Sequence, residues 1–91
     1  MELTEVEQRV LKALAAKDKM LARELVEAAR ASTSVLNPSI EHLEQLGLVT
    51  EERENEFPRR RFIMLTEKGK KVAELLFEIE KLISQTSLSN S

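Results

Sequence analysis

The side chains available for catalysis are few. The sequence has one histidine, His42, and no cysteine, tyrosine or tryptophan. A nucleophile–base pair would need His42 to meet a serine or threonine, and no local pattern brings them together. Gly47 and Gly69 are the only glycines and are too far apart for a phosphate-binding loop. Sixteen acidic residues with one histidine make a poor transition-metal site. We therefore expect neither an enzyme nor a resident metal or cofactor.

Nucleic-acid binding is the chemistry that the basic residues favour. Residues 59–71 contain six basic side chains and one acidic one, whereas the whole chain has a formal net charge of −2. The basic residues are Arg59, Arg60, Arg61, Lys68, Lys70 and Lys71, and they are suited to phosphate contact. In an alternative interpretation, the three arginines pair with Glu51, Glu52, Glu54 and Glu56 and keep an edge strand soluble.

The composition is that of one folded domain. The 91 residues are 42% hydrophobic and 33% charged, which is enough to build a core. No apolar run approaches the roughly 20 residues of a transmembrane helix, and the N-terminus does not resemble a signal peptide. We expect a soluble, cytoplasmic domain over residues 1–84, followed by a disordered tail at 85–91.

Apolar residues at helical spacing predict three helices in the first half of the chain. Thr4 and Glu7 have the spacing of a capping box and open the first helix. The second helix covers roughly 22–31, and the short apolar link at 20–21 before it has at most one or two residues of strand. The third helix has the apolar stripe Leu36, Ile40, Leu43 and Leu46.

The third helix has a clear end and two possible starts. Gly47 is expected to end it in the left-handed conformation. Either Asn37 caps the helix with Pro38 in the first helical position, or the helix begins near Thr33 or Ser34 with Pro38 inside it.

The second half of the chain predicts a β-hairpin and a final helix. Residues 48–53 and 60–65 are strand-like and flank a charged loop. The last helix is expected over 66–84, with Thr66 as its cap and Gly69 tolerated at a cost of about 1 kcal/mol relative to alanine. The predicted class is α+β and mostly helical: a three-helix core, a two-stranded wing and a long C-terminal helix.

Two stretches give this order of elements a specific resemblance. Residues 40–49 (IEHLEQLGLV) look like a recognition helix running into a wing, and residues 65–71 (LTEKGKK) resemble the junction between the wing and the last helix of MarR-like and PadR-like transcription regulators. The chain thus resembles a winged helix-turn-helix domain over residues 3 to about 84.

The resemblance implies that the third helix enters the DNA major groove and that the wing reaches the phosphate backbone. The DNA-binding residues would be Ser34, Asn37, Ser39, His42, Gln45, Arg59, Arg60, Arg61 and Lys68. His42 is alternatively an ordinary exposed residue of the helix. The third helix departs from the family pattern because it has Glu41 and Glu44 and no lysine or arginine, and carboxylates are repelled by phosphates.

The last helix is predicted to hold a second chain. Val72, Leu76, Ile79 and Ile83 step by four, three and four residues, which is the spacing of a coiled-coil seam. A two-fold dimer would present two third helices to a pseudo-palindromic site. The alternative is a wide core-facing helix in a monomer.

These observations predict a homodimeric transcription regulator that binds duplex DNA sequence-specifically, with no identifiable effector. The competing interpretation is a winged-helix protein-interaction module that does not bind DNA, favoured by the acidic third helix.

Overall fold

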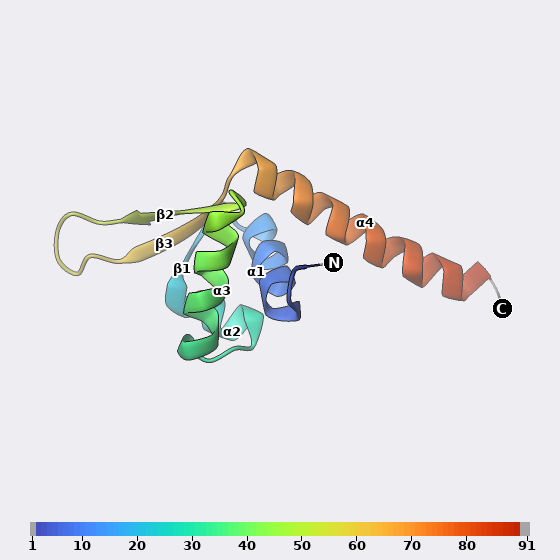
Figure 1. Cartoon of the computed structure of the whole chain (residues 1–91), viewed down its shortest axis with the longest axis horizontal. Coiled ribbons are helices and arrows are strands. Elements are labelled where there is room, and N and C mark those ends of the chain that lie inside the picture. The colour runs from blue at the N-terminus through green and yellow to red at the C-terminus, as the bar shows by residue number, and fades with distance from the viewer. Residues whose placement is uncertain (1, 90–91) are drawn as a thin grey trace.

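The computed structural model describes residues 2–89, with side chains through residue 85. The elements in chain order are α1 (Glu5–Ala16), β1 (Lys19–Leu21), α2 (Ala22–Ala29), α3 (Thr33–Gln45), β2 (Val49–Arg53), β3 (Arg61–Leu65) and α4 (Glu67–Ser89). The molecule measures 56 × 26 × 22 Å because the β2–β3 wing and the C-terminal part of α4 project from opposite sides of the helical core (Figure 1). The predicted mostly helical α+β architecture is confirmed.

Helix α1 begins at the predicted capping box. The Glu7 amide donates to Thr4 Oγ1 over 3.1 Å, and Glu7 Oε1 accepts from the Thr4 amide over 2.9 Å. Val10, Leu11 and Leu14 then follow at helical spacing and are all buried. The start and the buried face of α1 are therefore both encoded locally.

Helix α3 takes the earlier of the two possible starts, so Pro38 lies inside it. Ser32 is its N-cap, and the Leu36 amide donates to the Ser32 carbonyl over 2.8 Å. Pro38 lacks the amide that would bond four residues back. That loss falls on an exposed face, because both Ser34 and Pro38 are exposed and water can solvate the free carbonyl.

The sheet is larger than the predicted two-stranded wing. Its strand order is β1-β3-β2, and both pairings are antiparallel. Ile63 of β3 is aligned with Met20 of β1 on one side and with Glu51 of β2 on the other. The short link before α2 is thus a three-residue strand that ties the base of the wing to the helices.

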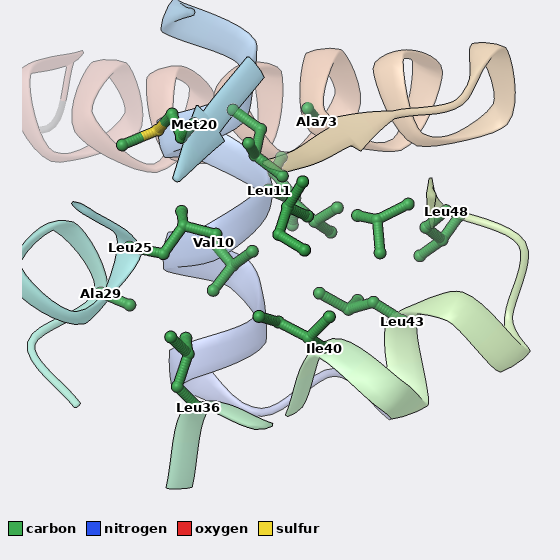
Figure 2. Packing of buried hydrophobic residues seen from close by; sticks show 14 residues of the cluster. Val10, Leu11, Met20, Leu25, Ala29, Leu36, Ile40, Leu43, Leu48 and Ala73 are labelled. Carbon is green, nitrogen blue, oxygen red and sulfur yellow. The ribbon is translucent and has the colours of Figure 1, made fainter. Parts of the chain in front are cut away.

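The core lies where α1 meets the other helices and the sheet (Figure 2). Leu11, Leu25, Ile40, Leu43 and Ile63 are completely buried. Leu46, predicted to continue the buried stripe of α3, is 37% exposed instead. Leu46 is the C-cap, one residue after the helix ends at Gln45, and it keeps φ of −78° and ψ of −6°. The buried stripe of α3 therefore stops at Leu43.

The predicted ends of α3 and α4 have different outcomes. Gly47 has φ of 75° and ends α3 as predicted. Helix α4 continues to Ser89, so the disordered tail expected from residue 85 is wrong as far as residue 89. Asn90 and Ser91 lie outside the described residues.

Candidate nucleic-acid interface

One face of α3 is polar and open to solvent. Ser34, Asn37, Glu41 and Gln45 are exposed and recur at intervals of three and four residues, so they form one stripe along the helix. Three of these side chains can hydrogen-bond to base edges or phosphates. Glu41 places a carboxylate in the middle of the same stripe.

Ser39 does not belong to this face. Its side chain is only 7% exposed, and its hydroxyl donates to the Val35 carbonyl over 3.0 Å. The expectation that Ser39 is exposed is therefore wrong. The hydroxyl is hydrogen-bonded within α3, so it is not left without a partner in its buried position.

His42 points toward α1. Its Nδ1 lies 2.6 Å from Glu7 Oε2, and Glu7 is only 3% exposed although it is acidic. The sequence pattern identified Glu7 only as a capping residue, whereas its second carboxylate oxygen holds α3 against α1. The His42 ring thus has a partner inside the domain through Nδ1, while its side chain is still 39% exposed. No pattern along the chain connects two residues 35 positions apart.

Two of the three arginines at 59–61 pair with wing glutamates. Arg60 binds both carboxylate oxygens of Glu54, each over 2.9 Å, and Arg61 Nε lies 2.8 Å from Glu51 Oε2. The pairing given in the alternative interpretation thus occurs for Arg60 and Arg61, although β3 is the central strand of the sheet and not an edge strand. Among residues 2–89, none forms an ion pair with Arg59, which has φ of 54° near the wing tip.

Pairing with arginine lowers the pKa of two wing glutamates. The Arg60 guanidinium and backbone amide lower the pKa of Glu54 to about 2. Partial burial raises the pKa of Glu51, but hydrogen bonds from Arg53 and Arg61 outweigh that effect, and the pKa is lowered. Both carboxylates therefore stay ionised and neutralise much of the positive charge of the wing.

A side-chain contact joins the wing to α3. Arg61 Nη1 donates to Asn37 Oδ1 over 3.0 Å. Asn37 lies on the exposed stripe of α3, and Arg61 begins β3. The polar face of α3 and the base of the wing therefore form one continuous surface.

Lys68 and Thr66 hold α4 against the end of α3. Lys68 Nζ donates to the Leu46 carbonyl over 2.7 Å, and Thr66 Oγ1 donates to the Gly47 carbonyl over 2.6 Å. The ammonium group thus sits at the negative end of α3. Lys68 is exposed, but this position gives it a role in the α3–α4 junction that the sequence did not reveal.

The predicted dimerisation seam is divided between the core and the surface. Leu76 is 4% exposed and Val72 packs against the buried cluster, whereas Ile79 and Ile83 are 44% and 62% exposed. The exposed apolar residues of α4 also include Leu75, Phe77 and Leu82. Leu75, Ile79 and Leu82 are spaced by four and three residues, so the apolar stripe that faces solvent is shifted from the predicted one.

Neither a metal-binding cluster nor a membrane-spanning helix is found in the described part of the chain. Among the described residues, no three histidine, aspartate or glutamate side chains gather in a way that could hold a metal ion. In the same part of the chain, no helix is long and apolar enough to cross a bilayer.

Comparison with known proteins identifies relatives over most of the chain. The family model for the HxlR-like helix-turn-helix matches residues 6–90. The transcriptional regulator HosA of Escherichia coli is 35% identical over 71 residues, which are 78% of this chain and 53% of HosA. The chain thus spans about half the length of the curated relatives it matches.

Solved structures agree with this relationship. A MarR-family transcriptional regulator from Silicibacter pomeroyi is 29% identical with a TM-score of 0.77, covering 84% of this chain and 51% of that one. The PcaV transcriptional regulator from Streptomyces coelicolor is 26% identical with a TM-score of 0.86, covering 99% of this chain and 66% of that one. The predicted winged-helix resemblance is confirmed, and the chain belongs to the HxlR-like helix-turn-helix family of transcription regulators.

Proposed function

We propose that this protein is a transcription regulator that binds duplex DNA sequence-specifically, with α3 in the major groove and the wing on the backbone. The observation that carries the proposal is the Asn37–Arg61 contact, which makes the exposed stripe of α3 continuous with the basic wing. A helix beside a projecting hairpin fits the major groove and the adjacent phosphates together. Such a role corresponds to a cytoplasmic location.

The candidate DNA-binding residues differ in the contacts that they can make. Ser34, Asn37 and Gln45 are candidates for base or phosphate contacts on α3. His42 stays a candidate through its second ring nitrogen, because only Nδ1 contacts Glu7 and the side chain is partly exposed. Ser39 is not one, because it is buried and its hydroxyl bonds within the helix. Arg59 is the wing arginine whose charge no described carboxylate neutralises. Arg60 and Arg61 retain donors beyond those that bind Glu54 and Glu51, because a guanidinium has five N–H groups.

The proposal includes a homodimer formed through α4. Leu75, Ile79 and Leu82 form an exposed apolar stripe along α4, and the C-terminal part of this helix extends beyond the core (Figure 1). Pairing two such stripes would remove apolar surface from water and set two α3 helices at a fixed separation.

A salt series on a duplex tests the proposal. Binding of the full chain, followed by fluorescence anisotropy, should weaken steeply as salt rises because phosphate contacts release counterions. Arg59→Asn should reduce the slope of log affinity against log salt by about one for each bound chain, and so by about two for the dimer. Asparagine is chosen because it tolerates the positive φ of this position.

The competing function is a protein-interaction module. It is favoured by the neutralised arginines Arg60 and Arg61 and by Glu41 on the exposed stripe of α3. No binding to any duplex at low salt would support this alternative and overturn the proposed function. Binding with an unchanged slope in Arg59→Asn would overturn only the wing assignment.

A further inference from the structure

A basic groove lies between the start of α2 and the wing. It has a volume of about 400 Å³ and is lined by Leu21, Ala22, Arg23, Pro58, Arg60 and Arg61. Three of the six lining residues are arginines and none is acidic. A shallow groove with this lining is suited to an anion rather than to an apolar ligand.

Two of the three arginines that line the groove form ion pairs with carboxylates, and the third does not. Arg60 is paired with Glu54 and Arg61 with Glu51, so these two guanidinium groups are held in place by carboxylates outside the groove. Arg23 is exposed and forms no ion pair within residues 2–89. The positive charge of Arg23 is therefore not neutralised by an ion pair. It lies beside the guanidinium groups of Arg60 and Arg61, whose orientation is fixed by Glu54 and Glu51.

The position of the groove indicates the source of the anion. Arg61 lines the groove and also binds Asn37 on the exposed stripe of α3. The groove thus opens beside the face that the proposed function assigns to the major groove. A phosphate at the edge of the DNA major groove would then lie against the guanidinium groups of Arg23, Arg60 and Arg61.

We propose that this groove binds one phosphodiester group of the DNA backbone and that Arg23 is its principal contact. The inference rests on the proposed function and extends it to α2, an element that the sequence did not connect with DNA. Arginine suits this position because its planar fork can donate two parallel hydrogen bonds to phosphate oxygens.

The test compares Arg23→Gln with Lys81→Gln in the full chain. Lys81 is also exposed and without an ion pair among the described residues, but it lies on α4, away from the groove. Each lost phosphate contact should lower the salt slope of duplex binding by about 0.9. A dimer that loses one contact in each half-site should therefore show a slope lower by about 1.8 and an affinity about sixtyfold weaker at about 0.1 M salt. Lys81→Gln should bind like the wild type, and Arg23→Lys should recover part of the affinity.

A second measurement locates the contact on the DNA. Single phosphates of a selected binding site are replaced by neutral methylphosphonates. Neutralising one particular phosphate in each half-site should weaken binding by the wild type. The same replacement should not weaken binding by Arg23→Gln any further, because that variant already lacks the contact. A response of Arg23→Gln equal to that of the wild type at every phosphate would overturn the inference.

The outcomes separate this inference from the proposed function. Duplex binding by the wild type with an unchanged slope in Arg23→Gln would overturn the groove assignment and leave the proposed function intact. Absence of any duplex binding by the wild type would overturn both. Inorganic phosphate shifting the Arg23 side-chain NMR signals, while duplex affinity is insensitive to Arg23→Gln, would assign the groove to a free phosphate and contradict the DNA contact.

Discussion

Gly69 lies where the first turn of α4 meets the end of α3. A Cβ atom built on it would be 1.9 Å from the Leu48 carbonyl oxygen, which itself accepts from the Thr66 amide. The sequence analysis treated this glycine as a modest cost to helix α4. The contact shows that a side chain is excluded because two backbone segments touch at this point.

Gly69→Ala should therefore lower the free energy of unfolding. In an exposed helix interior, the same change would add about 1 kcal/mol of stability. Here the methyl group must push backbone apart, so we expect a loss of about 1–3 kcal/mol in urea denaturation. The exposed Lys71→Ala should change stability by less than about 0.5 kcal/mol. A Gly69→Ala chain as stable as the wild type would show that the junction relaxes freely.

The Glu54–Arg60 pair makes a prediction about pH. The pKa of Glu54 is about 2 in the folded chain, below its ordinary value of 4.5. The pair therefore favours the folded chain above about pH 4.5, and this contribution disappears as the pH falls toward 2. In an NMR titration, Arg60→Gln should move the pKa of Glu54 back toward its ordinary value. A Glu54 carboxyl that titrates at the same pH in both chains would contradict the pairing.

At the scale of elements, α3 is positioned by contacts at both its ends and along its side. His42 reaches Glu7 of α1, Asn37 reaches Arg61 of β3, and Leu46 receives Lys68 of α4. Ile40 and Leu43 of the same helix pack into the buried core (Figure 2). The orientation of the exposed stripe of α3 thus depends on three other elements.

His42→Ala tests this anchoring. The substitution would leave one oxygen of the buried Glu7 carboxylate without its partner, so unfolding should cost about 1–3 kcal/mol less. Gln45→Ala, on the exposed stripe of the same helix, should have little effect on stability. In a double-mutant cycle with Glu7→Gln, the two losses should be less than additive because they report one contact. Strict additivity would show that the pair contributes nothing.

At the scale of the whole molecule, the wing and α4 extend in opposite directions from one small core (Figure 1). The first part of α4 is held by the core through Ala73 and Leu76. Lys12 of α1 also forms an ion pair with Glu80. On an adjacent face, α4 presents Leu75, Ile79 and Leu82 to solvent, which fits a surface that pairs with a second chain.

Ile79→Glu should dissociate the proposed dimer. Light scattering coupled to size-exclusion chromatography should give twice the chain mass for the wild type and the single chain mass for the variant, because a charge would be buried in the seam. Lys81→Glu, which adds the same charge on a different face of α4, should remain dimeric. A wild-type chain that elutes as a monomer at every concentration would contradict the dimer.

The sequence alone determined most of the elements and the family resemblance. Helical spacing, the capping box at Thr4 and Glu7 and the glycine at 47 act through neighbours along the chain, so their consequences can be predicted locally. The same is true of the hairpin and the short junction around Thr66, because both are encoded by contiguous residues.

Only the tertiary structure decided which polar residues remain available for a partner. Ser39 is buried, and His42 contacts Glu7 while staying partly exposed. Arg60 and Arg61 are paired, and Arg23 of α2 lines the same groove as these two arginines. The seam on α4 shifts for the same reason, because the core takes Leu76. These outcomes depend on contacts between residues distant in sequence. The basic stretch at 59–71 remains the main positive segment, but its free charge is smaller than its composition predicts, because folding brings Glu51 and Glu54 against it.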